Sequence, residues 1–172
     1  MNYLNKCQTD CYATIGSTVC KGAVVTLSDK GAALESFVDY LREKGFACTP
    51  QRRAVLEEIL ASPNHFDAEE LAARMRRRGD GVSRATVYRT VGHLCKAGVV
   101  RKIDVDQTHA LYECTAGVGH HEHLICRRCG RITEFQDFAL EKKITAIAEA
   151  NHFRMERHTV QIFGLCGRCS EQ

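Results

Sequence analysis

The sequence predicts an α+β chain of two small domains, because two different patterns follow one another along it. Apolar residues recur at helical spacing from residue 28 to about residue 97, and a β-hairpin pattern follows. A β-β-α-β pattern that contains two Cys-x-x-Cys pairs fills the last part. A chain of 172 residues is long enough for two such domains. We therefore expect domains over 28–115 and 119–172, after a poorly ordered tail over 1–27.

The helices of the first domain are predicted by their start and stop signals. Thr49-Pro50, Asp67 and Ser83 are typical N-terminal caps, while Gly45, Ser62-Pro63 and Gly98 are typical stops. Strand-like residues 99–104 and 110–114, joined by a turn around 106–107, then predict a hairpin. This order is typical of a winged helix-turn-helix, in which the helix before the hairpin enters the DNA major groove and the hairpin forms the wing.

Positive charge is concentrated in the same part of the chain. Residues 41–102 contain 13 Lys and Arg against 7 Asp and Glu, although the whole chain has a net charge of only +3. An excess of this kind favours a polyanion as partner. The alternative interpretation is that the arginines of 74–78 form a solvated helix end.

The overall composition limits which classes of protein the chain can belong to and where it can be located. With 44% hydrophobic and 26% charged residues, the chain has the content of a soluble globular protein. No apolar run reaches the roughly 18 residues that a membrane span needs, and the N-terminus resembles no export signal. We therefore expect a cytoplasmic protein without a membrane partner, whose 10 Cys are better explained by metal binding than by disulfides.

The second domain contains a predicted metal site of four cysteines. Strands are expected over 122–126, 131–135 and 153–165, and a helix over 138–150. Cys126 with Cys129, and Cys166 with Cys169, form two Cys-x-x-Cys pairs, and Gly130 and Gly167 favour tight turns there. Two such pairs predict a closed tetrahedral site for structural Zn²⁺. Two redox dithiols are the alternative.

A run of histidines leads into the first of these strands. Because strand side chains alternate, His121 and His123 share one face, and His120 and Glu122 share the other. One strand could thus contribute to two sites with mixed nitrogen and oxygen ligands, which suit Fe²⁺, Mn²⁺ or Zn²⁺ rather than Ca²⁺. A solvated histidine loop is the alternative.

Four motifs together resemble the ferric uptake regulator (Fur) family of bacterial metal-responsive repressors. They are Thr49-Pro50-Gln51-Arg52, Ala85-Thr86-Val87-Tyr88-Arg89, the segment from His120 to Cys126, and Cys129-Gly130 followed by Glu134-Phe135. The resemblance covers roughly residues 30–170 and leaves out the tail.

The resemblance implies three metal sites and a DNA-binding surface. It assigns the structural zinc to Cys126, Cys129, Cys166 and Cys169. It assigns a regulatory site at the hinge between the domains to His65, Glu113, His121, His123 and Glu134. A third site within the second domain matches His120, Glu122, Glu141 and His158. Expected DNA contacts come from Lys44, Arg52, Ser83, Thr86, Tyr88 and Arg89.

The resemblance also implies a function. We expect a repressor that binds palindromic double-stranded DNA operators as a homodimer when Fe²⁺, Mn²⁺ or Zn²⁺ fills the hinge site. Glu113 and Glu134 favour iron sensing, because the peroxide-sensing branch commonly has Asp there. A peroxide- or zinc-sensing member is the alternative within the family.

Two rival classes stay open on the sequence alone. A metallohydrolase could use His121, His123 and Glu134, but no nucleophile or base motif accompanies them. A zinc-ribbon scaffold that binds a protein partner is the other. Six cysteines have no assigned role: Cys7, Cys11, Cys20, Cys48, Cys95 and Cys114.

Overall fold

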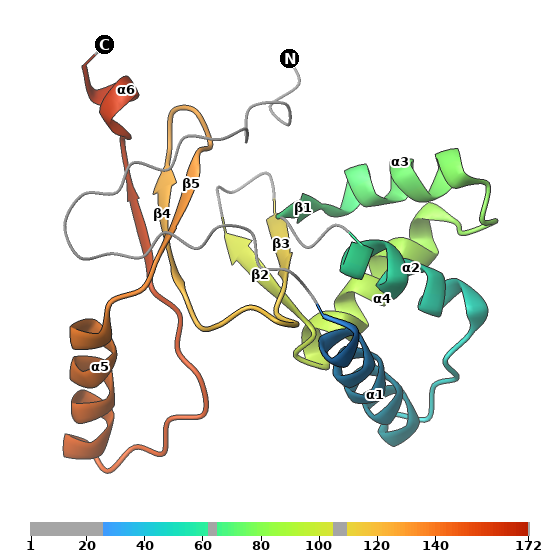
Figure 1. Ribbon diagram of the computed structural model, residues 1–172, viewed down its shortest axis with the longest axis horizontal. Coiled ribbons are helices and arrows are strands. Elements are labelled where there is room, and N and C mark those ends of the chain that lie inside the picture. The colour runs from blue at the N-terminus through green and yellow to red at the C-terminus, as the bar shows by residue number, and fades with distance from the viewer. Residues whose placement is uncertain (1–25, 62–64, 105–109, 172) are drawn as a thin grey trace. The chain divides into compact units, whose positions relative to one another are not determined.

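A computed structural model describes residues 26–61, 65–104 and 110–171. These residues form two compact units, one up to Gly119 and one from His120 onward (Figure 1). Three predictions fall outside the described residues: most of the tail over 1–27, of which residues 1–25 are not described, the stop at Ser62-Pro63, and the turn around 106–107. Leu27, which the prediction gave to the tail, is the first residue of helix α1.

The N-terminal unit contains four helices and a small sheet. Helices α1 (Leu27–Glu43), α2 (Pro50–Ala61), α3 (Ala68–Arg78) and α4 (Arg84–Lys96) are followed by strands β2 (Val100–Asp104) and β3 (Ala110–Cys114). The hairpin pairs antiparallel, with Val100 opposite Cys114. The predicted order of helices and wing is confirmed. A further strand, β1 (Phe66–Asp67), was not predicted, and it pairs with the other side of β3.

The helix starts in this unit follow the expected capping chemistry. The Oγ1 of Thr49 accepts a hydrogen bond from the Arg52 N–H, and Asp67 and Ser83 cap α3 and α4 in the same way. Helix α1 has a capping box at Thr26, one signal that the sequence analysis overlooked. All four helices contribute to one core, in which Phe37, Leu56, Leu71 and Leu94 are almost fully buried.

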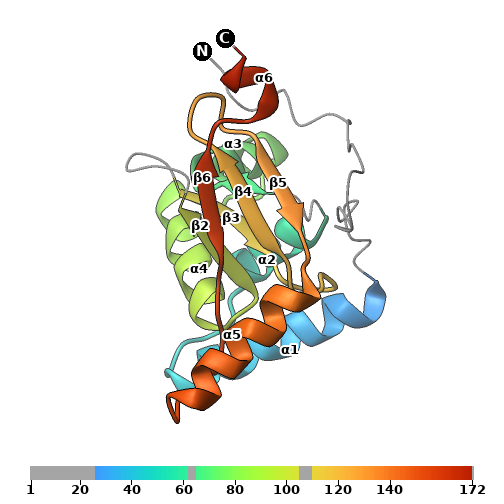
Figure 2. The same cartoon turned by 90° about the vertical axis from the view of Figure 1, so that its left-hand side faces the viewer.

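The C-terminal unit is built on a three-stranded sheet. Strand β4 (Glu122–Cys126) lies between β5 (Ile132–Phe135), which is antiparallel to it, and β6 (Gln161–Gly164), which is parallel. Helix α5 (Phe138–Ala150) connects β5 to β6, and a short helix α6 (Gly167–Ser170) ends the unit. Figure 2 shows α6 and the β4–β5 turn at the same end of the sheet, with α5 toward the other end.

The predicted strand over 153–165 is wrong for most of its length. Only Gln161–Gly164 form β6, because β4 offers partners only from His123 to Cys126. Residues 153–160 instead lead back from the end of α5 to the edge of the sheet, and Phe153 is 68% exposed. Helix α6 was not predicted either. Gly130 has the left-handed φ of 70° that its tight turn requires, whereas Gly167 does not have a positive φ.

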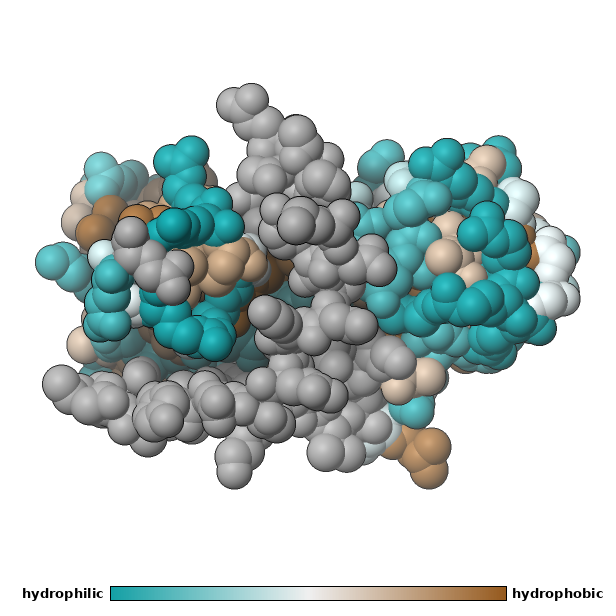
Figure 3. Space-filling view, turned by 90° about the horizontal axis from the view of Figure 1, so that it is seen from above, coloured by the Kyte–Doolittle hydropathy of each residue, from teal (hydrophilic) through white to brown (hydrophobic). Residues whose placement is uncertain are grey.

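The two units differ in how well they bury apolar side chains. Among the described residues of the C-terminal unit only Ile125 and Cys126 are buried apolar side chains, and none of α5 is buried. On the face that Figure 3 shows, hydrophobic residues are exposed on this unit, whereas the N-terminal unit is mostly hydrophilic. The C-terminal unit therefore has too small an apolar core to account for its stability.

Candidate metal centres and nucleic-acid interface

The four predicted zinc ligands meet at one end of the C-terminal sheet. Cys126 ends β4, and Cys129 lies in the turn to β5. Cys166 directly precedes α6, and Cys169 lies within that helix. Their four Sγ atoms lie within 4.8 Å of one another, and those of Cys129 and Cys166 are 3.8 Å apart. A tetrahedron with Zn–S bonds of about 2.3 Å has edges of about 3.8 Å. The donor set and its spacing thus fit zinc.

A backbone N–H group stabilises negative charge in this cluster, which favours binding of a cation. The Cys166 N–H donates to the Cys126 Sγ over 3.3 Å, and this bond is the main reason that the pKa of Cys126 falls to about 6. Burial and hydrogen bonds with the neighbouring thiols raise the pKa of Cys169 to about 12. A divalent cation bound here would displace the thiol protons and stabilise all four sulfurs as thiolates.

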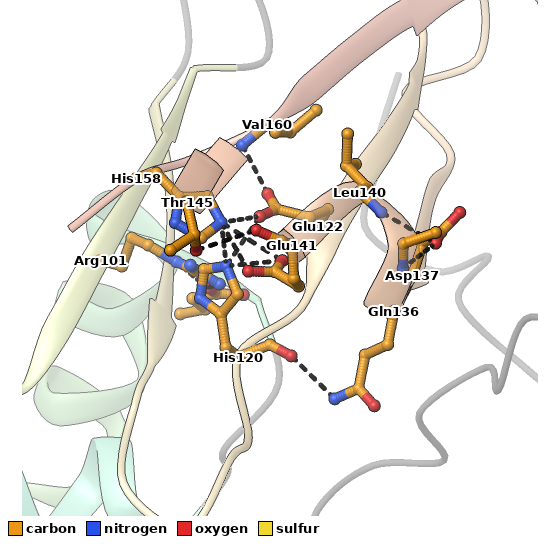
Figure 4. Close-up of polar contacts among 12 residues, drawn as sticks. Arg101, His120, Glu122, Gln136, Asp137, Leu140, Glu141, Thr145, His158 and Val160 are labelled. Atoms are coloured by element: carbon orange, nitrogen blue, oxygen red, sulfur yellow. Dashed lines mark hydrogen bonds and ion pairs between the residues drawn. The ribbon is translucent and has the colours of Figure 1, made fainter. Parts of the chain in front are cut away.

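A second cluster contains two histidines and two carboxylates, all from the C-terminal unit. Figure 4 shows the rings of His120 and His158 and the carboxylates of Glu122 and Glu141 converging on one point. His120 Nε2 lies 2.7 Å from Glu122 Oε1 and 2.8 Å from His158 Nε2. His158 Nε2 lies 3.1 Å from Glu122 Oε1 and 3.2 Å from Glu141 Oε2. These separations are close to the edges of about 3.0–3.4 Å in octahedral or tetrahedral shells with bonds of about 2.1 Å.

The surrounding backbone orients this second cluster. The Val160 N–H donates to Glu122 Oε2, which leaves Oε1 directed toward the two imidazoles. Glu122 is only 1% exposed, so its charge requires compensation within the cluster. Gln136 Nε2 donates to the His120 carbonyl, which fixes the start of β4. The four residues thus fit a divalent cation with nitrogen and oxygen ligands.

The five residues predicted for the hinge site come from both units. Within the N-terminal unit, His65 Nε2 lies 3.2 Å from Glu113 Oε2, and Arg101 forms an ion pair with Glu113. Within the C-terminal unit, the rings of His121 and His123 are 4.9 Å apart, and His123 is opposite Glu134 across β4 and β5. Each unit therefore brings its own share of these donors together.

Four of the six residues predicted to contact DNA, Arg52, Ser83, Thr86 and Arg89, line one hollow at the start of α4. The Ser83 Oγ accepts from the Thr86 N–H over 3.1 Å, and Tyr88 and Arg89 lie exposed on the next turn. The hollow has a volume of about 330 Å³, with no carboxylate on its wall. It is lined by Thr49, Gln51, Arg52, Gly81, Ser83, Thr86, Arg89 and Thr90.

Two of the predicted DNA-contacting residues lie outside this hollow. Lys44, at the end of α1, pairs with the carboxylate of Glu43 in the exposed loop that follows the helix. Tyr88 donates to Glu69 of α3. The hollow also includes Thr49, Gln51 and Thr90, which were not predicted to contact DNA, because no local pattern indicates which helix starts lie side by side.

The fold and these donor clusters define a class of protein, a winged helix-turn-helix regulator with metal ligands in a second unit. A family model described as the ferric uptake regulator family matches residues 43–163. The ferric uptake regulation protein of Legionella pneumophila is 37% identical over 130 residues, which are 75% of this chain and 95% of that protein. The chain belongs to the ferric uptake regulator family, whose members are metal-responsive transcription factors and not enzymes.

Solved structures agree with this assignment. The Helicobacter pylori ferric uptake regulator, described as having three functional metal binding sites, matches 88% of this chain and 99% of its own, with a TM-score of 0.70 and 25% identity. The Pseudomonas aeruginosa regulator, solved with manganese, matches 74% of this chain and 95% of its own, with a TM-score of 0.65 and 28% identity. The predicted α+β fold and the predicted family are confirmed. None of these relatives supports the metallohydrolase alternative.

Proposed function

We propose that this chain is an iron-responsive repressor that binds palindromic operators as a homodimer in the cytoplasm when its regulatory site is filled. The observation that supports this most strongly is the presence in one chain of an exposed recognition helix and of converging metal ligands. The family relatives named for ferric uptake regulation favour iron over zinc or peroxide. Glu113 and Glu134, where peroxide sensors commonly have Asp, point the same way.

The DNA-binding role falls to α4 and the residues beside it. Arg89, exposed and without a carboxylate in hydrogen-bonding range among the described residues, donates to guanine in the major groove. Ser83, Thr86 and Arg52 line the hollow and hold backbone phosphate, and Lys44 reaches the minor groove. The lack of carboxylates around the hollow supports this, because a phosphate would meet only donors there.

The metal-binding roles divide among three sites. Cys126, Cys129, Cys166 and Cys169 hold the structural zinc, which compensates for the small apolar core of the C-terminal unit. His120, Glu122, Glu141 and His158 hold a second cation within that unit. His65 and Glu113 from one unit, with His121, His123 and Glu134 from the other, form the regulatory site.

The regulatory site explains how metal controls DNA binding. A cation bound by ligands from both units restricts the angle between them, and in a dimer that angle sets the spacing of two recognition helices. His65 and Glu113 already lie 3.2 Å apart, so the N-terminal unit needs little rearrangement to contribute its two ligands. Arg101 forms an ion pair with Glu113 and helps to hold that carboxylate beside His65.

The homodimer is supported by the apolar surface of the C-terminal unit. Within the described residues, Ile147, Phe153, Ile162 and Phe163 are 45–68% exposed. Several large exposed apolar residues on a unit this small usually mark a protein interface. Burying them against a second copy would also supply the core that one copy does not have.

A gel-shift experiment tests the proposed function. The chelated protein is mixed with palindromic A·T-rich duplexes, with and without added Fe²⁺ or Mn²⁺ under anaerobic conditions. We expect binding only with metal, and a weaker effect of Zn²⁺ at equal free concentration. Failure to bind any such duplex in the presence of every metal contradicts the repressor, and preferential activation by Zn²⁺ contradicts the assignment to iron.

A further inference from the structure

Glu69, in the first turn of α3, accepts hydrogen bonds from two side chains of the recognition helix. Its Oε2 lies 2.6 Å from Arg84 Nε and 2.9 Å from the Tyr88 hydroxyl. The guanidinium of Arg84 also lies over the Tyr88 ring, 5.4 Å from its centroid. Three side chains, each 44% exposed or more, thus form one cluster on the surface of the DNA-binding unit.

This cluster is unusual because it places a carboxylate at the DNA-facing start of α4. Ser83 caps that helix, and Arg84 is its first residue, so DNA phosphates are expected close to Glu69. A carboxylate in that position repels phosphate and reduces affinity for any DNA sequence. It also neutralises Arg84, which would otherwise add a sequence-independent phosphate contact.

The same carboxylate fixes the orientation of Tyr88. With its hydroxyl bonded to Glu69 and its face covered by Arg84, the ring has one defined position before DNA arrives. The hydrogen bond from Tyr88 is the main reason that the pKa of Glu69 lies below its usual value, so the carboxylate stays ionised. A fixed ring loses less conformational entropy when it packs against one particular base step.

We infer that Glu69 is the positioning residue that sets sequence discrimination: it holds Tyr88 and Arg84 in place for the operator and weakens binding to other DNA. The inference rests on the proposed DNA-binding function. Specificity is a difference of affinities, and an element that weakens wrong complexes contributes to it as directly as a favourable contact.

Glu70 provides a matched control for charge. It is the next residue of α3, and it pairs with Arg74 of its own helix rather than with α4. Glu69→Gln and Glu70→Gln therefore make the same change of net charge one residue apart, but only the first disturbs the cluster on α4. The stability of both variants is compared by thermal unfolding, because an acidic residue in the first turn also stabilises the helix end.

The test measures binding of the full-length protein, loaded with Zn²⁺ and Mn²⁺, to two labelled duplexes. One duplex is selected from a random pool by the wild-type protein, and the other has the same composition in scrambled order. The affinity ratio is the affinity for the selected duplex divided by that for the scrambled duplex. We expect Glu69→Gln to bind the scrambled duplex more tightly and so to lower this ratio at least about fivefold. The salt slope on scrambled DNA should steepen by about 0.9, since Arg84 becomes available to one more phosphate.

Further variants separate positioning from charge. Glu70→Gln should leave the affinity ratio within about twofold of wild type, because it only changes long-range charge. Tyr88→Phe should lower the ratio in the wild-type background, but add nothing in Glu69→Ala, where the Tyr88 hydroxyl has no acceptor on α3. Glu69→Asp should recover little, because its shorter side chain no longer reaches both donors.

The possible outcomes distinguish the inference from the function on which it rests. Equal ratios for Glu69→Gln and Glu70→Gln overturn the inference, as does an additive effect of Tyr88→Phe in the double variant. If the wild-type protein enriches no duplex from the pool, the proposed DNA-binding function itself is wrong.

Discussion

At the scale of single residues, donor chemistry decides where metal is expected. Cys126, Cys129, Cys166 and Cys169 were recognisable from spacing alone, because two Cys-x-x-Cys pairs with suitable turns have few other uses. Glu141 and His158 were found only through the family resemblance, since they are 17 residues apart and neither lies in a local motif. What brings them together is the return of the chain from α5 to β6, which no local pattern specifies.

Removing one ligand of the four-cysteine cluster should unfold the C-terminal unit. We expect Cys166→Ser to lose its stoichiometric zinc and to lower the stability of that unit by several kcal/mol, because its apolar core is small. Zinc content is measured by atomic emission, and unfolding by circular dichroism and hydrogen exchange. Cys48→Ser, half-buried and outside the cluster, is the control. Full zinc content in Cys166→Ser would contradict this role.

His93 should make the N-terminal unit sensitive to acid. Its ring packs against Phe46 at 4.8 Å and Tyr40 at 5.9 Å. Burial, with Arg52, Lys96 and Arg89 adding to it, lowers its pKa below the usual 6.5. The unfolded chain therefore binds the proton more readily, so stability is complete above about pH 6.5 and decreases as pH falls through the folded-state pKa.

The prediction for His93 is checked by urea unfolding of the chelated protein between pH 5 and pH 7.5. His93→Phe keeps an aromatic ring against Phe46 but cannot titrate, so it should lose less stability on acidification than wild type. His152→Gln, which changes an exposed histidine of the other unit, should behave like wild type. Parallel pH profiles for wild type and His93→Phe would show that His93 is not responsible.

At the scale of elements, capping signals were the most informative part of the sequence. Asp67 and Ser83 each mark the start of a helix, and both predicted starts are confirmed. Strand ends were predicted less well. The residues of 153–160 have a strand-like pattern, but a strand needs a partner, and β4 provides partners only for four residues of β6.

Two substitutions of Ser83 should separate its effect on the stability of α4 from its effect on DNA binding. Ser83→Ala removes the acceptor of the Thr86 N–H and should lower stability by about 1 kcal/mol. Ser83→Asp keeps an acceptor and adds a favourable charge at the helix start, so stability should be retained. Its charge should nevertheless weaken DNA binding at least about tenfold, because it faces phosphate. Unfolding and gel-shift titrations compare the two, and equal DNA affinity for wild type and Ser83→Asp would place phosphate elsewhere.

At the scale of the whole molecule, the order of elements predicted the two units, but their mutual arrangement is not contained in local patterns. The sequence of helices, wing and β-β-α-β follows from periodicity and turn residues. The proposed regulatory site uses groups that are far apart in the chain, such as His65 and His123, and only the family resemblance associated them. No helix in the described part of the chain is long and apolar enough to cross a membrane.

The last prediction concerns coupling between metal and DNA across the whole chain. If His65 helps to bind the regulatory cation, His65→Ala should reduce the stimulation of operator binding by Mn²⁺ from the usual range of about 5–150-fold to nearly none. Binding without metal should stay unchanged, and the zinc held by the four cysteines should be retained. Reciprocity requires that operator DNA tighten Mn²⁺ binding by the same factor in wild type, and by nearly nothing in His65→Ala. Fluorescence anisotropy measures the stimulation of operator binding by Mn²⁺, and calorimetry measures the tightening of Mn²⁺ binding by operator DNA.

His152→Ala is the control variant. Because it removes an exposed imidazole of the other unit, it should preserve both factors. Full metal stimulation in His65→Ala would show that His65 is not a ligand of the regulatory cation.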